Sequence, residues 1–376
     1  MEVRPLVASE VYTRRVRRAQ ELLAANGIDL LILTSSVDMF YLTGFTDEQR
    51  ERLMFLMVPR APREPVFVLP ALYETEARTS TQVEDIRIWR DGQDPFAPVL
   101  ETLASLGRPD PVVAIDDVMF ARFLLPLVKR ARAEWTSAAP VMVTLRLAKD
   151  ALEIATMKEV GRLTDEVMAR AVAACAPGVE EVTVARLIQR TFGELGAEPT
   201  ATLPIVAAGP NGAMPHYRAG DRRMQRGDLV VLDFCGSVDG YWSDITRTIC
   251  IGEASEEAIR VYQLVEQAHR AGVARCVAGE TCQAVDTAAR GVITAGGYGP
   301  AFIHRTGHGL GLEIHEEPQI VGVNPQRLEA GMVFSVEPGI YLPGRFGARV
   351  EDCVVVNAEG PATELTSFPH GEILVV

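Results

Sequence analysis

The sequence predicts two domains, an α/β domain followed by an α+β domain. With 376 residues the chain is long for one hydrophobic core. Short aliphatic runs alternate with helical stretches up to about residue 147, whereas strands and turns dominate beyond residue 203. We therefore place the boundary between 1–147 and 148–376.

The first domain is predicted from alternating helical and aliphatic segments. A helix over 9–26 is indicated by apolar residues on one side and by Gly27 as its stop. β-Branched and aliphatic runs then predict strands, and the stretches between them predict helices. The strands are expected at 30–33, 53–58, 66–69, 86–89 and 112–115, and the helices near 73–79, 96–106 and 121–132.

The second domain is predicted to begin with helices and to continue as a sheet. Apolar residues at helical spacing follow Asp150, and Pro177 with Gly178 ends that helix. Further segments follow the same rules. Helices are expected over 181–195 and as a pair between 256 and 295, and strands over 230–234, 245–251, 333–336 and 350–356.

Composition narrows the function classes. A net charge of −13 argues against a nucleic-acid partner, because phosphate binding requires surplus Lys and Arg. The longest early apolar run is far too short to cross a bilayer, so no membrane partner is expected. The N-terminus lacks the apolar core of a signal peptide, and this favours a cytoplasmic location.

Five positions of the second domain combine metal-binding residue types with strand-like or glycine-rich surroundings. Asp233 interrupts an apolar run, and Asp239-Gly240 predicts a hairpin turn that lets Asp244 face it from the next strand. Two facing carboxylates repel each other, and a cation between them removes the repulsion. The set is Asp233, Asp244, His308, Glu337 and Glu351.

The chemistry of this set predicts two divalent ions. Four carboxylates and one imidazole form an oxygen-rich set of donors, which suits manganese or cobalt. It differs from a zinc centre built from thiolates. Two ions ~3.5–4 Å apart can share a hydroxide and polarise a carbonyl. His216, His304 and His315 then remain for proton transfer and oxyanion contacts. Each of these residues taken alone has a structural explanation, and the prediction rests on their joint occurrence.

The motifs together resemble the metallopeptidase family with the pita-bread fold, which includes prolidases, aminopeptidase P and methionine aminopeptidases. The similar stretches are NGAMPHYRAG, LVVLDFCGSVDGYWSDITRT, FIHRTGHGLGLEIHEEP, VFSVEPGIY and ARVEDCVVV. The resemblance covers essentially the whole chain, and it implies a creatinase/prolidase-like domain over 1–147 and a pita-bread catalytic domain over 148–376.

The resemblance also implies roles for individual residues. Asp233 would bind one metal, Asp244 and Glu351 would bridge, and His308 and Glu337 would bind the second metal. A metal-bridging hydroxide would attack the carbonyl, with Glu337 as proton shuttle. The remaining roles concern the substrate. His216 and His315 resemble the substrate-contacting histidines, and Arg349 would pair with a substrate carboxylate or hold Glu351.

The implied function is that of an Xaa-Pro dipeptidase, or prolidase, with two divalent ions per subunit. Manganese is the expected ion, with cobalt or zinc as alternatives, and a homodimer is expected. Gln319 stands where some prolidases have an arginine near the substrate carboxylate. Two alternatives therefore stay open, namely aminopeptidase P acting on longer peptides and a family hydrolase of a small amide metabolite. Creatinase-like and non-enzymatic relatives lack the metal ligands, and a methionine aminopeptidase lacks such a long first domain.

Overall fold

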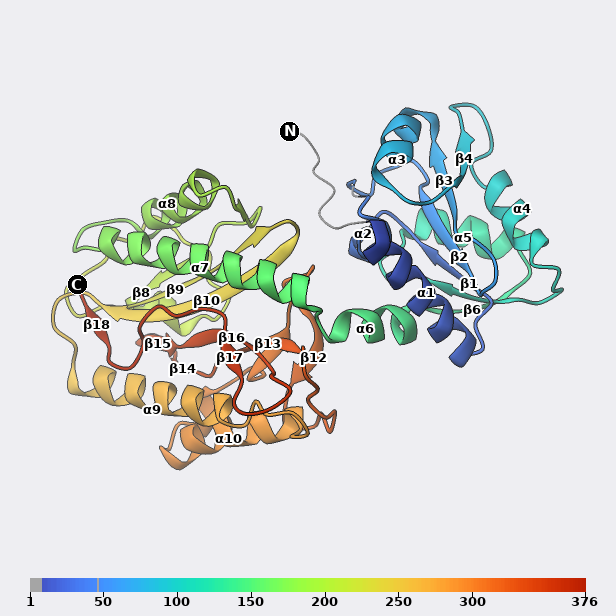
Figure 1. The fold of residues 1–376 in the computed structure, drawn as a ribbon. Helices are drawn as coiled ribbons and strands as arrows, with labels where there is room; N and C mark the ends of the chain where they lie inside the picture. The colour runs from blue at the N-terminus through green and yellow to red at the C-terminus, as the bar shows by residue number, and fades with distance from the viewer. Residues whose placement is uncertain (1–8, 46) are drawn as a thin grey trace. The chain divides into compact units, whose positions relative to one another are not determined.

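The computed structural model describes residues 9–45 and 47–376. These residues divide into two compact units between Arg146 and Leu147, which are coloured blue to green and green to red in Figure 1. The first unit alternates helices and strands around a mixed sheet, and the second unit is of the α+β type. Both features agree with the fold class that the sequence predicts.

The first unit is built on a six-stranded sheet in the order β4-β3-β2-β1-β5-β6. The central strand β1 has four fully buried aliphatic residues, which is typical of a strand covered on both faces. Residues of α4 and α5, among them Val99, Leu103 and Phe123, pack into the core of this sheet. The strands are β1 Leu30–Leu33, β2 Phe55–Pro59, β3 Val66–Pro70, β4 Asp85–Trp89, β5 Val112–Ile115 and β6 Glu134–Ser137, and the helices are α1 Ser9–Ala25, α2 Val37–Thr43, α3 Glu74–Ser80, α4 Ala97–Ser105, α5 Ala121–Arg130 and α6 Ala139–Leu147.

Three elements of this unit are absent from the sequence prediction. They are α2, β6 and α6. Strand β6 lies at the edge of the sheet, where it pairs in parallel with β5 only. Its sequence, EWTS, is half-exposed and lacks an aliphatic run, because an edge strand has less apolar surface to bury.

The second unit contains a ten-stranded sheet with the path β12-β11-β13-β16-β10-β9-β7 and a separate β14-β15 pair. Strands β9 and β10 form a long hairpin, in which Val238 pairs with Tyr241. The two-residue turn between them has positive φ at Asp239 and Gly240, as the Asp-Gly sequence predicts. The strands are β7 Glu198–Pro199, β8 Ile205–Ala208, β9 Leu229–Val238, β10 Tyr241–Cys250, β11 Gly307–Gly309, β12 Glu316–Ile320, β13 Val333–Val336, β14 Gly339–Leu342, β15 Phe346–Arg349, β16 Glu351–Val355, β17 Thr363–Glu364 and β18 Leu374–Val375.

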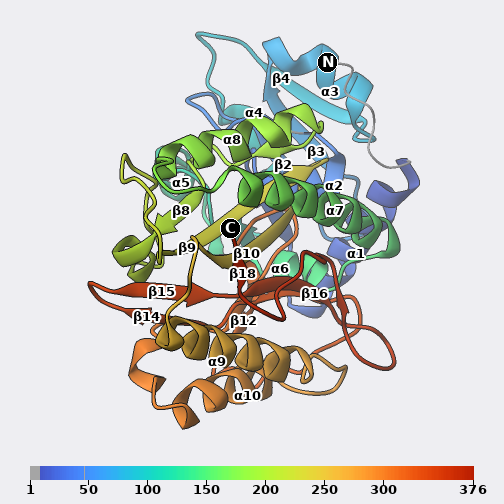
Figure 2. The ribbon, with the colours of Figure 1, turned by 90° about the vertical axis from the view of Figure 1, so that its left-hand side faces the viewer.

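Four long helices of the second unit lie on two sides of its strands (Figures 1 and 2). Helices α7 and α8 share a core with β9 and β10, and α9 and α10 share another with β14 and β15. A capping box at Asp150 and Glu153 starts α7, where the sequence change predicts a helix. Among the described residues no helix is both long and apolar enough to span a membrane. The four helices are α7 Ala151–Ala174, α8 Glu181–Glu194, α9 Glu256–Val273 and α10 Cys282–Ala295.

Close packing of α8 on β9 depends on a glycine. A Cβ on Gly236 would lie 2.2 Å from the ring of Phe192, which is fully buried. We expect Gly236→Ala to lower the free energy of unfolding by about 1–3 kcal/mol through overpacking. Urea denaturation measures this change.

Gly193 provides the control, because it lies in the same helix and a Cβ there meets nothing within 4 Å. Gly193→Ala should be neutral or stabilising by up to about 1 kcal/mol. Equal destabilisation by both substitutions would contradict the packing argument.

Candidate active site

The β9-β10 hairpin brings Asp233 and Asp244 to one face of the sheet. The register pairs Asp233 with Thr246 and Asp244 with Cys235, so the two aspartates are diagonal neighbours rather than directly opposite. The two-residue turn fixes this register. The residue opposite Asp233 is Thr246, which lies two positions after Asp244. Alternation of side chains along a strand still places both carboxylates on the same face.

Glu351 joins this face from the neighbouring strand. Strand β16 pairs with β10 so that Glu351 lies opposite Thr246. The Thr246 hydroxyl donates a 2.6 Å hydrogen bond to Glu351 Oε2, and both residues are buried. Thr246 therefore orients the Glu351 carboxylate toward the two aspartates.

His308 approaches from β11, between two glycines that permit close contact with neighbouring strands. A Cβ on Gly307 would lie 1.8 Å from the Ser335 carbonyl oxygen. His308 Nδ1 lies 3.1 Å from the Gly309 carbonyl oxygen, which fixes the ring with the proton on Nδ1. Nε2 then offers its lone pair to the cleft, 3.5 Å from Glu337 Oε1 and 4.0 Å from Asp244 Oδ2.

The carboxylates of the cleft are short of positive charge. Burial, reinforced by neighbouring acidic groups, raises the pKa of Asp244 and of Glu351 well above their usual range. Burial also raises the pKa of Glu337 to about 7. Among the described residues, Asp244 Oδ1 is buried and has no hydrogen-bond partner.

This environment fits a divalent metal. Burial lowers the pKa of His308 to about 3, so its imidazole is neutral and able to donate a lone pair. Ligand atoms of Asp244, His308 and Glu351 all lie within 4.8 Å of one another. A cation among them would satisfy the unpaired Asp244 oxygen and offset the repulsion between the carboxylates.

All nine residues that the sequence singles out line one cavity of about 990 Å³ within the second unit. The cavity also has apolar lining, which includes Leu203, Met214 and Ile303. The nine residues come from strands and loops far apart in the sequence. They are His216, Asp233, Asp244, His304, His308, His315, Glu337, Arg349 and Glu351.

The three additional histidines have different surroundings. His216 and His315 are exposed on the cavity wall, and the His315 ring lies edge-on to His308 with centroids 4.3 Å apart. His304 is half-buried, and its Nδ1 and Nε2 lie 2.6 Å from the Arg305 carbonyl oxygen and 2.8 Å from the Tyr341 hydroxyl. Both ring nitrogens of His304 thus have protein partners, whereas His216 and His315 face the open cavity.

Arg349 is buried and bonded on every side of its guanidinium. It donates to Thr246 Oγ1, to the Tyr341 hydroxyl and to Asp233 Oδ2. The Tyr341 hydroxyl in turn forms a hydrogen bond with His304 Nε2. These contacts favour the structural role over contact with substrate, and they hold Asp233 rather than Glu351.

The structure also brings in residues at or beside the cavity that the sequence did not single out. Thr246 and Tyr341 belong to the quoted motifs but carry no charge, so nothing in their residue type marked them. Cys235 lines the cavity between the two aspartates on β9 and β10. Arg305 also lines it, and its position three residues before the glycine-flanked His308 was the one available signal.

Comparison with known proteins matches both units of the chain to described families. Residues 155–358 match metallopeptidase family M24, and residues 15–148 match the creatinase/prolidase N-terminal domain. The chain belongs to metallopeptidase family M24. It is therefore a metal-dependent peptidase, and its pita-bread fold is the one that the sequence predicts.

Several M24 relatives resemble the chain over almost its full length. A probable dipeptidase, PepE, of Mycobacterium bovis is 40% identical over 98% of this chain and 97% of its own. An Xaa-Pro dipeptidase of Lactobacillus delbrueckii is 31% identical over 91% of this chain and 94% of its own. The crystal structure of a prolidase from Thermococcus sibiricus has a TM-score of 0.91 and 35% identity, and it covers 97% of this chain and 99% of its own.

The role of Arg349 can be tested by its charge. We expect Arg349→Met to lower the free energy of unfolding by about 1–3 kcal/mol in the presence of a chelator, because the partly buried Asp233 loses its charged partner. A saturating divalent metal should restore part of this loss. Urea denaturation with and without metal measures both effects.

Arg345→Met is the matched control, since Arg345 pairs with Glu257 at the surface and should contribute only about 0–1 kcal/mol. A loss for Arg349→Met that is the same with and without metal would contradict a role in balancing the cleft carboxylates.

Proposed function

We propose that this chain is an Xaa-Pro dipeptidase that hydrolyses the peptide bond preceding proline. The observation that carries the proposal is the single cavity into which five ligand-type residues and three histidines converge. The M24 relatives described as dipeptidase, Xaa-Pro dipeptidase and prolidase support the same activity.

We propose that the five ligand-type residues hold two divalent ions. Asp233 would belong to one ion, His308 and Glu337 to the other, and Asp244 and Glu351 to both. Only oxygen and imidazole donors are offered, which favours manganese, with cobalt or zinc as alternatives. Bound there, the ions would activate water and polarise the scissile carbonyl.

The chain's own groups then orient the substrate and carry protons. Glu337 is placed to pass a proton, because its carboxyl group lines the cavity with Oε1 3.5 Å from His308 Nε2. His216 and His315 are free to donate hydrogen bonds to the substrate from the cavity wall. His304 contributes by fixing the Tyr341 hydroxyl, which also accepts from Arg349.

Arg305 offers the positive charge that a dipeptidase needs. It lines the cavity and donates to the Gln319 side chain, at the position where some prolidases have an arginine. The guanidinium thus lies next to that position although it comes from another part of the chain. We propose that it binds the carboxylate of proline, which a dipeptide has and an internal proline lacks.

We propose residues 148–376 as the catalytic domain and 1–147 as an accompanying domain, in a cytoplasmic homodimer. Sedimentation of the intact protein measures the oligomeric state.

Peptide length is the experiment that tests the function. Metal-stripped protein is assayed with Met-Pro and with a matched Xaa-Pro tripeptide, before and after manganese is added. We expect manganese-dependent cleavage of the dipeptide alone. Asp244→Asn should abolish activity and metal retention, whereas Asp239→Asn in the exposed turn of the same hairpin should leave both unchanged.

Other outcomes move the assignment. Turnover of the tripeptide that equals or exceeds that of the dipeptide would assign the chain to aminopeptidase P. No turnover of either peptide with metal bound would direct the search to small amide metabolites.

Carboxylate recognition by Arg305 predicts a selective loss in the variant Arg305→Met. The KM for Xaa-Pro should rise about 10–100-fold, the value of one lost charge-assisted bond, with little change in kcat. The KM for the corresponding Xaa-Pro amide should not change, because the amide has no carboxylate. Steady-state kinetics on both substrates measures the difference.

Arg327→Met, which removes an exposed arginine bonded to the Gly279 carbonyl, controls for the overall charge. An equal rise in KM for acid and amide would show that Arg305 does not read the carboxylate.

A further inference from the structure

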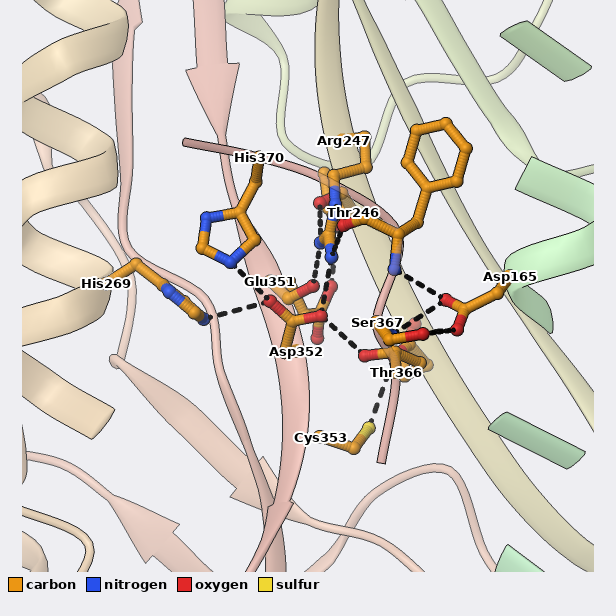
Figure 3. Close-up of polar contacts among 12 residues, drawn as sticks. Asp165, Thr246, Arg247, His269, Glu351, Asp352, Cys353, Thr366, Ser367 and His370 are labelled. Atoms are coloured by element: carbon orange, nitrogen blue, oxygen red, sulfur yellow. Dashed lines mark hydrogen bonds and ion pairs between the residues drawn. The ribbon is translucent and has the colours of Figure 1, made fainter. Parts of the chain in front are cut away.

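A second group of metal-binding side chains lies in the same unit, away from the cavity. Its members come from α9, from β16 and β17 and from the C-terminal segment. Figure 3 shows three of them, with the side chains of His269 and His370 directed toward Asp352. One ligand atom from each lies within 4.8 Å of the others. They are His269, Asp352, Glu364 and His370, and none of them lines the cavity.

Strand alternation separates this group from the active site. Glu351 and Asp352 are consecutive on β16, so their side chains point to opposite faces of the sheet. Their partners on β10 alternate in the same way, because Thr246 bonds Glu351 and Arg247 bonds Asp352. Asp352 therefore belongs to the face away from the proposed metal pair.

Several buried polar atoms of this group make no hydrogen bond, although three of them lie within ion-pair distance of a neighbouring side chain. His269 is fully buried, yet within the described part of the chain neither of its ring nitrogens has a hydrogen-bond partner. The same holds for Asp352 Oδ2 and for His370 Nδ1. Buried polar groups are normally hydrogen-bonded, so four such atoms gathered in one place point to an occupant.

The contact between His269 and Asp352 has the geometry of two ligands. His269 Nε2 lies 3.2 Å from Asp352 Oδ2, yet the two atoms do not form a hydrogen bond. His370 Nε2 lies 3.6 Å from the same oxygen. Tetrahedral zinc with bonds of about 2.0–2.1 Å separates its ligand atoms by about 3.4 Å, close to both distances.

Asp352 is prepared to use one oxygen as a ligand. Its Oδ1 accepts from Arg247 at 2.6 Å and from the Thr366 hydroxyl at 2.5 Å, which leaves Oδ2 available. Hydrogen bonds of this kind to the second oxygen orient ligating carboxylates in metal sites. The guanidinium of Arg247 is further tied to the carbonyl oxygens of Glu351 and Phe368.

The imidazoles are in the protonation state that a metal needs. Burial lowers the pKa of His269 to about 4 and also lowers the pKa of His370. Both rings are therefore neutral at neutral pH. Glu364 of β17 pairs with Val354 of β16, so its side chain lies on the same face as that of Asp352. It contributes a second carboxylate.

We propose that His269, Asp352, Glu364 and His370 form a third, structural metal site that takes zinc. Two imidazoles and two carboxylates are a donor set that zinc accepts in tetrahedral geometry. The ion would tie α9, β16, β17 and the C-terminal segment together. It would thereby fix β16, the strand that carries Glu351, without contact with the substrate.

Metal counting tests this proposal on the full-length protein. Chelator-stripped protein is titrated with Zn²⁺, and bound zinc is counted by plasma mass spectrometry after gel filtration. We expect three equivalents per chain, and two for His370→Gln and for Glu364→Gln. Glu364 is exposed, so its variant should fold even where a change at His370 prevents folding.

Two comparisons make the count specific. Arg270→Gln, which alters an exposed neighbour of the group without removing a ligand, should keep three equivalents. Asp244→Asn in the active site should lose cleft metal and retain the third equivalent, so this proposal and the proposed function fail separately.

Thermal unfolding gives a second readout. Zinc added beyond two equivalents should raise the Tm of the native sequence and of Arg270→Gln, but not that of His370→Gln or Glu364→Gln. A native protein that never exceeds two equivalents would overturn the proposal, as would variants that still bind three. The group would then hold buried water instead of an ion.

Discussion

The second unit is organised around the repulsion between carboxylates that are buried together. Asp233, Asp244, Glu337 and Glu351 share one cavity, and burial raises the pKa of three of them. Arg349 offsets one charge through Asp233, and a neutral His308 adds no positive charge. The remaining excess of negative charge favours the binding of cations in the cleft. In the absence of cations the carboxylates would have to bind protons instead.

The sheet supports this arrangement with rigid backbone. The carboxylates come from β9, β10, β16 and the end of β13, which are paired neighbours or nearly so. Glycine at 307 lets β11 approach β13 closely enough for His308 to reach the same face. The geometry is therefore set by backbone hydrogen bonds and by contacts within one unit, rather than by flexible loops.

Residue type and spacing predicted most of the fold and the composition of the candidate site. The Asp-Gly turn identified the hairpin, and the apolar runs identified β1, β9 and β13. Strands such as β11, β12 and β15 were not predicted, because glycine-rich or polar segments owe their pairing to neighbours distant in sequence. The diagonal offset of Asp233 and Asp244 likewise depends on register, which residue type alone did not reveal.

The sequence also did not identify the uncharged residues that form hydrogen bonds with the site residues. Thr246 and Tyr341 were invisible as functional residues, since a hydroxyl becomes informative only when its acceptor is known. The burial of His269 was not apparent from the sequence either, because this histidine lies in a helix beside the charged residues Glu266 and Arg270. His269 is nevertheless fully buried, since tertiary packing of α9 turns that side inward.

The consecutive acids Glu351 and Asp352 allow β16 to pair in only one register without loss of their hydrogen bonds. A slip of one residue would move Glu351 into the core and Asp352 into the cleft, and both polar groups would lose their partners at once. Two neighbouring acids of nearly equal chemistry thus disfavour a shifted register of the strand. A chain that mispaired this strand would lose hydrogen bonds on both faces, so the native alignment is favoured twice over.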